Sequence, residues 1–231
     1  MMQTPLNTAY APSETLVVSR NKVLRNTYLM LALTLIPTMV GAMLGINLSF
    51  AFMRASPLMS ALGMMAVIYG LFFAVEKNRN NSLGVALLLG LTFVMGVLLG
   101  PLLQVALKLS NGAQLVGVAA GGTAITFFVL AGIASSGKRD FSNLSKFLTV
   151  GAVVLMLAVV ANLFLQLPAL HLTLCAGFIL FSSALILYQV NDVVNGGETS
   201  YVSATLSIYV SLYNIFTSLL QLLMAFGGER D

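Results

Sequence analysis

The sequence predicts an all-α membrane protein built as a bundle of seven transmembrane helices, and two observations lead to this fold class. First, 58% of the 231 residues are hydrophobic and only 8% are charged, with a mean hydropathy of +0.96, whereas a soluble domain carries about 25% charged residues. The polar side chains are therefore too few to cover a surface that faces water. Second, the apolar residues form continuous runs of about 20 residues, the length of helix that crosses a hydrocarbon core about 30 Å thick.

Seven such runs can be placed along the chain, separated by short breaks rich in Pro, Gly, Asn and Ser. The runs are continuously apolar and lack the alternation of about ten-residue strands, which argues against a β-barrel. The break at 166–169 is so brief that the fifth and sixth spans are expected to form an antiparallel hairpin. The predicted spans cover residues 28–48, 58–75, 82–102, 113–135, 144–166, 169–189 and 201–226.

The distribution of Lys and Arg predicts the orientation, because these residues are enriched in cytoplasmic loops. Eight lie on the side of the N-terminus and three on the other side, so the N-terminus is expected in the cytoplasm and the C-terminus outside. The chain then divides into a disordered cytoplasmic tail (1–27), the seven-helix domain (28–226) and a short extracytoplasmic end (227–231). The eight are Arg20, Lys22, Arg25, Lys77, Arg79, Lys138, Arg139 and Lys146, and the three are Arg54, Lys108 and Arg230.

The seventh span carries a stripe of polar residues at spacings of three and four, which places them on one face of a helix. A polar face is costly against lipid, so this span is expected inside the bundle. Two interpretations stay open: hydrogen bonds between helices, or the lining of a hydrated pathway. Asn162, Gln166 and Gln104 are candidate partners. The stripe consists of Ser203, Ser207, Ser211, Asn214, Ser218 and Gln221.

Glycine and proline predict several local features. The pairs Gly96/Gly100 and Gly117/Gly121 have the spacing that lets two membrane helices approach closely. Pro101, directly after Gly100, is expected to kink or end the third span. In the polar pause before the seventh span, Gly196–Gly197 is expected to end one helix, and Thr199 or Ser200 to cap the next.

The residues that carry catalytic or metal chemistry are scarce. The single cysteine, Cys175, lies within an apolar run and is expected to pack there. The single histidine, His171, lies near the outer end of the sixth span and is expected at the interface or packed. No metalloprotease, serine-hydrolase or P-loop motif is present, and every acid falls in a tail, a loop or a span end. The sequence argues against an enzyme, and no cofactor, metal or nucleic-acid partner is expected.

Five stretches resemble the Bax-inhibitor (TMBIM) family: KVLRNTY (22–28), GP (100–101), GGTAITFF (121–128), VANLFLQLPALHL (160–172) and GGETSYVSATLSIYVSLYNIF (196–216). The resemblance implies the Bax-inhibitor fold, with the seventh helix central and enclosed by the other six. It is closest to a bacterial inner-membrane member that modulates the membrane AAA protease FtsH. The implied function is therefore that of an inner-membrane partner and slow substrate of FtsH.

The polar tail gives this implied function a possible mechanism. Residues 1–19 include Pro5 and Pro12 and carry a single charge, at Glu14. An unfolded cytoplasmic terminus is a segment that an ATP-driven protease can grip. The other interpretation is a disordered leader without function.

The resemblance also implies an alternative function, a pH-sensitive cation or calcium leak. Calcium-conducting members carry two aspartates, late in helix six and midway along helix seven, whose proton-sensitive interaction holds the cytoplasmic side closed. The matching positions here are Gln189 and Ser211. Neutral side chains cannot form a carboxylate pair and bind a hard cation poorly, which weakens this alternative. Asp192, three residues after Gln189, is a possible substitute acid, or simply an exposed acid at a helix end.

Overall fold

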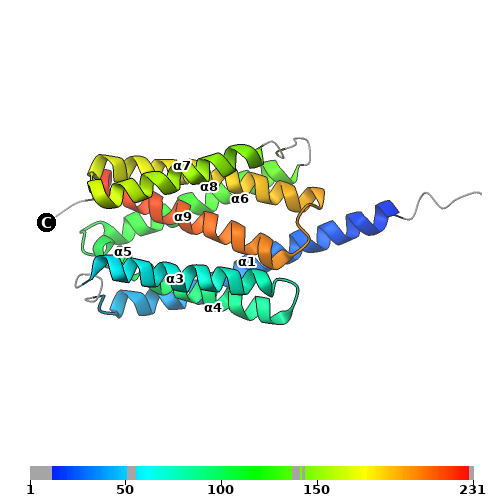
Figure 1. The fold of residues 1–231 in the computed structure, drawn as a ribbon, viewed down its shortest axis with the longest axis horizontal. Helices are drawn as coiled ribbons and strands as arrows, with labels where there is room; N and C mark the ends of the chain where they lie inside the picture. The colour runs from blue at the N-terminus through cyan, green and yellow to red at the C-terminus, as the bar shows by residue number, and fades with distance from the viewer. Residues whose placement is uncertain (1–11, 51–55, 137–140, 142–143, 229–231) are drawn as a thin grey trace, which may run out of the picture.

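The computed structural model describes residues 12–50, 56–136, 141 and 144–228, with the backbone alone for residues 12–19, 57, 58 and 61. Throughout this described part the regular structure is α-helical, which confirms the predicted all-α class. Figure 1 shows the helices as a bundle of nearly parallel rods. They are α1 (Pro12–Asn47), α3 (Pro57–Lys77), α4 (Ser82–Leu98), α5 (Gly100–Ala106), α6 (Gly112–Ser135), α7 (Leu144–Leu165), α8 (Pro168–Asn195) and α9 (Tyr201–Gly227).

The helices have the length and the surface of membrane spans. Six runs in the described residues are long and apolar enough to cross a bilayer, with α4 and α5 together forming one of them. The 21-residue α3 is a further long apolar helix. Large hydrophobic side chains on the outside of the bundle are exposed, including Phe164 at 84% and Phe226 at 79%. Such a surface is stable against lipid rather than water, so the fold is compatible with a membrane helical bundle.

The largest differences between the helices and the predicted spans are at two helix ends. α1 begins at Pro12, before the predicted start at residue 28, and α8 continues to Asn195, beyond the predicted end at 189. Hydropathy locates the part of a helix that lies in lipid, and a helix continues into water until a residue stops it. In α8 that residue is Gly196, with a φ of 81°.

The predicted break in the third span is confirmed. α4 ends at Leu98 and α5 begins at Gly100, with Pro101 in its first turn. Pro lacks the backbone N–H that would continue the hydrogen-bond ladder, and its fixed φ suits a first helical turn.

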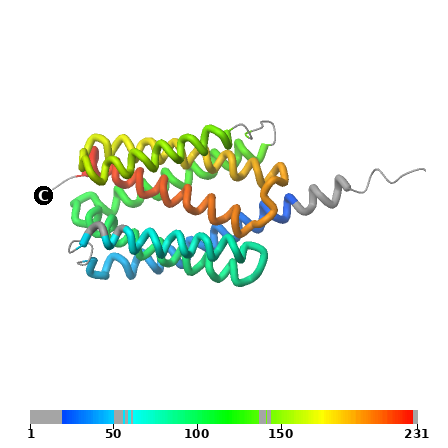
Figure 2. The backbone as a smooth tube through the Cα atoms, viewed as in Figure 1, coloured from blue at the N-terminus to red at the C-terminus, as the bar shows by residue number. Residues whose placement is uncertain are grey.

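Figures 1 and 2 show α9 running obliquely between a pair of helices formed by α7 and α8 and a second pair formed by α3 and α4. α9 contacts α1, α3, α4, α5, α6 and α8, whereas α7 contacts only α8 among the described helices. The main hydrophobic core lies along α9 where it meets α1, α4 and α6, and includes Leu31, Leu91, Phe127 and Ile208.

One of the two predicted glycine pairs forms a close helix contact. A side-chain Cβ on Gly96 would overlap the carbonyl oxygen of Thr38, and a Cβ on Gly100 would overlap that of Gly45. The absence of side chains therefore lets α4 and α5 lie directly against the backbone of α1, and this prediction is confirmed.

The prediction for the other glycine pair is wrong. No atom lies within 4 Å of the position that a Cβ would take on Gly117 or Gly121, and both residues are exposed. α6 turns a different face inward, with Leu115 and Ala119 buried. The spacing of the pair was suitable for a helix contact, but the spacing does not reveal which face of a helix meets a neighbour.

The ends of α8 and α9 follow the predicted capping. The Gly196 and Gly197 amides donate to the carbonyls of Val193 (3.1 Å) and Asp192 (2.9 Å), the pattern of a Schellman motif. At the next helix, Ser200 is the N-cap, and its hydroxyl accepts from the Ser203 amide at 3.4 Å. A helix–turn–helix unit therefore delivers the start of α9 in a fixed position.

The connections gather at two ends of the bundle. At one end the Ser200 hydroxyl donates to the Arg79 carbonyl, which joins the turn after α3 to the turn before α9. At the opposite end the Gln104 amide donates to the carbonyls of Gly45, Ile46 and Leu48 at 2.9–3.2 Å. Gln104 therefore completes the C-terminal end of α1 and does not meet the polar stripe.

Candidate functional site: a polar junction and the polar face of α9

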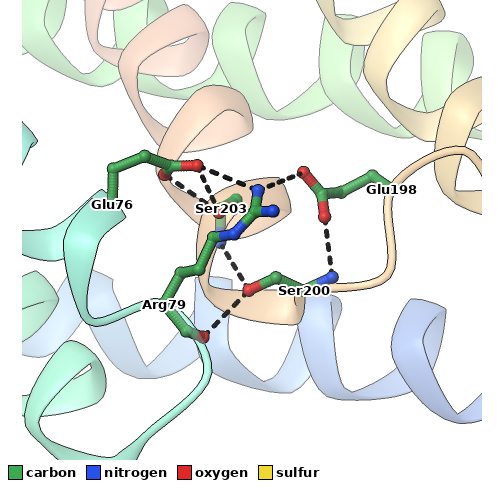
Figure 3. A network of polar contacts seen from close by, with 5 residues as sticks. All are labelled: Glu76, Arg79, Glu198, Ser200 and Ser203. Atoms are coloured by element: carbon green, nitrogen blue, oxygen red, sulfur yellow. Dashed lines mark hydrogen bonds and ion pairs between the residues drawn. The ribbon is translucent and has the colours of Figure 1, made fainter.

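A group of five polar residues joins α3 to α9 at the end of the bundle where α9 begins, and we call it the α3–α9 junction (Figure 3). Glu76 belongs to the last turn of α3, and Arg79 to the turn that follows it. Glu198 and Ser200 precede α9, and Ser203 lies in its first turn. Two loops that are distant in the sequence thereby form one hydrogen-bonded unit.

The hydrogen bonds of the junction start from two buried serines, each 4% exposed. The Ser203 hydroxyl lies 2.9 Å from both carboxylate oxygens of Glu76. The Ser200 hydroxyl donates to the Arg79 carbonyl at 2.9 Å, and the Ser200 amide donates to Glu198 at 2.7 Å. Each serine thus links the start of α9 to a different part of the α3 end.

The Arg79 guanidinium lies between the two acids of the junction. Its Nη1 is 3.2 Å from Glu76 Oε1 and 3.7 Å from Glu198 Oε2. The side chains of Arg79 and Glu76 are more than 40% exposed, while that of Glu198 is 16% exposed. Exposed ion pairs contribute little stability, so the pairs orient the groups, whereas the buried hydroxyls fix the position of α3 against α9.

The sequence predictions did not find the junction. They placed every acid, Glu76 and Glu198 included, in a tail, a loop or a span end, and they named no partner for these two. Two signals were present: both acids fall on the side assigned to the cytoplasm, and Ser200 and Ser203 are three residues apart at the start of a helix. Neither signal states that the loop at 78–81 meets the loop before α9, which is a property of the tertiary packing.

The positions that match the family's sensor aspartates are not joined to one another. Ser211 is 1% exposed, and its hydroxyl donates to the Ser207 carbonyl of its own helix at 2.9 Å. Gln189 is partly buried. The Asp192 carboxylate lies against the backbone of Gly197, because a Cβ there would overlap it. Within the described residues no hydrogen bond links Gln189, Ser211 and Asp192, so Asp192 is directed toward the turn after α8.

The polar stripe of α9 has three different environments. Ser203, Ser211 and Ser218 are buried, Asn214 and Gln221 are partly buried, and Ser207 is exposed. Ser203 belongs to the junction. At the other end of the helix, Asn214, Ser218 and Gln221 line a cavity of about 280 Å³ between α7, α8 and α9. The stripe is therefore not one continuous buried face.

Three further residues named from the sequence, His171, Cys175 and Asn162, also line this cavity. The His171 Nε2 and Gln221 Oε1 atoms are 2.7 Å apart, and the Sγ of the buried Cys175 lies 4.0 Å from the same nitrogen. Asn162 lines the cavity, and its buried Oδ1 has no hydrogen-bond partner among the described residues. A cavity with polar walls and this volume can hold water that satisfies such groups.

Gln166, the remaining predicted partner of the stripe, lies elsewhere. It is exposed in the turn after α7, where its amide donates to the Asn162 carbonyl at 2.8 Å. Its φ of 48° is left-handed, the conformation that often closes a helix C-terminus. Gln166 therefore ends α7 through its backbone and does not line the cavity.

Comparison with known proteins places the chain among membrane proteins. It is 49% identical over 214 residues to an uncharacterised protein of Neisseria meningitidis serogroup A, covering 92% of this chain and 94% of that one. It is 42% identical over 211 residues to the modulator of FtsH protease YccA of Escherichia coli K12, and equally to the inner membrane protein YccA of E. coli O6:H1. The match to YccA covers 90% of this chain and 92% of the relative.

The similarity to these relatives, together with the apolar helices, identifies the chain as a multi-pass inner-membrane protein. A family model described as the inhibitor of apoptosis-promoting Bax1 matches residues 20–228, which includes every helix from the membrane part of α1 to α9. The chain belongs to the Bax-inhibitor family.

Proposed function

We propose that the protein is a modulator of an FtsH-type membrane AAA protease, acting as its binding partner and slow substrate. The observation that carries the proposal is the similarity to YccA over nine-tenths of the chain. The described residues also hold no group of three or more His, Cys, Asp or Glu side chains that could bind a metal, and the junction contains polar contacts rather than a nucleophile with its base. A role in protein interaction fits these features better than catalysis.

The topology that this function needs has seven spans, with the N-terminus in the cytoplasm, the last five residues outside and α9 as the central span. The excess of Lys and Arg at the end where α1 begins supports the orientation. The contacts of α9 with α1, α3, α4, α5, α6 and α8 support the central placement. In this orientation the α3–α9 junction faces the cytoplasm.

The packing of α1 suggests why degradation would be slow. A protease that pulls on the N-terminus loads α1 first, and α1 is packed against α4 and α5 through Gly41, Gly45, Gly96 and Gly100. Close backbone contact holds membrane helices together through dispersion forces. A chain that enters the protease easily and leaves the membrane slowly occupies the protease and delays other substrates.

The test removes residues 1–11, so that the chain begins with the first residue of α1. The truncated chain is expected to insert and fold as before but to become resistant to the protease, which lengthens its half-life in cells. The half-life of another membrane substrate of the protease should shorten at the same time. A matched control removes residues 229–231, at the other end of the chain, and should leave turnover unchanged. Equal half-lives for the full chain and the N-terminal truncation would refute residues 1–11 as the point of engagement.

A second candidate function is a cation leak, and the polar cavity at the far end of α9 favours it. The cavity is lined by Asn162, Asn214, Ser218 and Gln221, which could form part of a hydrated path. Liposomes that contain the purified chain and a calcium dye test this candidate. A flux that rises with pH and is lost in Asp192→Asn would support a leak in which Asp192 replaces the sensor acids. No flux at any pH would eliminate this candidate.

A further inference from the structure

A groove about 700 Å³ in volume lies between α1 and α6, with α9 as its floor. Its walls are apolar, with Leu31 and Leu35 on α1, Ala124 and Phe128 on α6, and Leu212 and Phe216 on α9. The backbones of α1 and α6 do not approach each other closely in the described part of the chain, and the two helices meet through the Tyr28 side chain, which contacts Ser135 and Phe127. Beyond these side-chain contacts, the side of the bundle between α1 and α6 is open down to α9.

The surroundings of this α1–α6 groove identify hydrocarbon as its neighbour. Phe128 is 71% exposed, and Leu29 and Ile125, on the flanking helices, are more than 60% exposed, which is suited to contact with lipid. The volume lies within the range of about 300–1,000 Å³ that is usual for a small-molecule site. Lipid tails are as apolar as leucine, so an acyl chain gains little by moving from bilayer to groove. A preference for one lipid over another must therefore come from the polar end of the groove, where the headgroup would lie.

The polar end of the groove lies near the beginning of the membrane part of α1. There the Tyr28 hydroxyl and the Ser135 hydroxyl are 3.3 Å apart and bridge the two walls. Arg25 precedes Tyr28 by three residues and Ala32 by seven, so it lies on the same face of α1 as these two groove residues. Arg25 is exposed and has no acidic partner among the described residues. Among the described residues, therefore, no acid competes with a phosphate for its guanidinium.

We propose that the α1–α6 groove binds one anionic phospholipid, with an acyl chain on the α9 floor and the phosphate at the Arg25 guanidinium. Basic sites between membrane helices are known to hold anionic headgroups. Because one of the Tyr28 and Ser135 hydroxyls donates to the other, the pair has one further O–H to donate beside the phosphate. The site does not depend on the proposed role at a protease, because it is built from the lipid-facing side of the bundle.

The acyl-chain part of the site is tested by filling the groove in the full-length chain. Gly132 lines the groove, and no atom lies within 4 Å of the position of its Cβ, so Gly132→Phe adds a ring without a backbone clash. Gly121 on the same helix is equally open but lies outside the groove, which makes Gly121→Phe the matched control. Native mass spectrometry of each detergent-purified variant, titrated with phosphatidylglycerol or phosphatidylcholine of the same acyl chains, counts the bound lipids.

The headgroup part is tested with Arg25→Ala against Lys77→Ala, which removes an exposed positive charge from α3, away from the groove. Wild type is expected to retain phosphatidylglycerol in preference to phosphatidylcholine, and Arg25→Ala to lower that preference about fivefold. Gly132→Phe should remove binding of both lipids, and both controls should resemble wild type. Equal binding of the two lipids by wild type, or undiminished phosphatidylglycerol binding by Gly132→Phe, would overturn the proposal.

Discussion

The single side chain with the most consequence for the junction is Ser203. Its hydroxyl is buried and lies within hydrogen-bond distance of both oxygens of Glu76, a residue separated from it by 127 positions in the sequence. A hydrogen bond to a charged group is stronger than one between neutral groups. Ser203 therefore links the start of α9 directly to the Glu76 carboxylate at the end of α3.

Ser203→Ala is expected to destabilise the protein by about 0.6 kcal/mol and by no more than about 1.7 kcal/mol, the average and the maximum measured for hydrogen bonds between membrane helices. The measurement is the midpoint of thermal unfolding of detergent-purified protein, followed by the same probe for each variant. Ser207→Ala is the control, because Ser207 is one turn further along α9 and exposed. Equal midpoints for the two variants would show that the contact with Glu76 contributes nothing measurable.

Arg79 should behave differently from Ser203, because its ion pairs with Glu76 and Glu198 are partly exposed. Arg79→Gln is expected to cost about 0.2–1 kcal/mol at low salt. The cost should disappear near 1 M salt, where the Debye length is about 3 Å. Unfolding midpoints at both salt concentrations measure the effect, with Lys77→Gln as a control for the loss of a positive charge. A cost that persists in high salt would mean that Arg79 acts through packing.

Among the helices, the tightest packing is that of α1 against α4 and α5, where glycines meet backbone atoms directly. Such an interface tolerates no added side chain unless the helices separate. α7 is the opposite case, since it contacts only α8 and buries a single side chain, that of Leu148. The stability of the bundle is therefore unevenly distributed among its helices.

The same substitution at two glycines should have opposite effects. Gly100→Ala places a methyl group against the Gly45 carbonyl, and overpacking of this kind costs about 1–3 kcal/mol. Gly117→Ala meets no atom within 4 Å, and the change from glycine to alanine within a helix stabilises by up to about 1 kcal/mol. The two unfolding midpoints should therefore move in opposite directions from wild type. A lowered midpoint for Gly117→Ala would reveal a contact at α6 that the monomer does not explain, such as a second copy of the chain.

Sequence reasoning identified the helices well because long apolar runs and capping residues are local signals. The runs located the long apolar helices, Gly196 marked the end of α8 and Ser200 marked the start of α9. Sequence reasoning was less informative about which face of a helix is packed against a neighbour and about which residues a polar side chain binds. The pairs Gly96/Gly100 and Gly117/Gly121 have the same spacing, yet only the first pair lies at an interface between helices. Gln104 was a candidate partner of the stripe but binds α1, because a polar side chain can satisfy several different carbonyls.

In the whole molecule, the candidate site arises from contacts that only the complete bundle creates. Glu76 and Arg79 meet Glu198 and Ser200 because α3 ends, and α9 begins, at the same end of the bundle. The polar cavity and the α1–α6 groove likewise each require three helices. A single sequence specifies which segments are helical, whereas the pairing of distant helices depends on the fit of all their side chains together.

The orientation of this bundle in the membrane decides whether the proposed function is possible, and two exposed loop residues test it. Asn80 lies in the turn between α3 and α4, and Lys108 in the turn between α5 and α6 at the opposite end. In a Cys175→Ser background, a membrane-impermeant maleimide added to spheroplasts should label Lys108→Cys but not Asn80→Cys. After the membrane is permeabilised, both should react. We expect the difference before permeabilisation because Lys and Arg are in excess at the end of the bundle that includes Asn80, which places this end in the cytoplasm. The reverse labelling would put α1's N-terminus and the junction outside the cytoplasm, beyond the reach of an ATP-driven protease, and would refute the proposed function while leaving the fold unchanged.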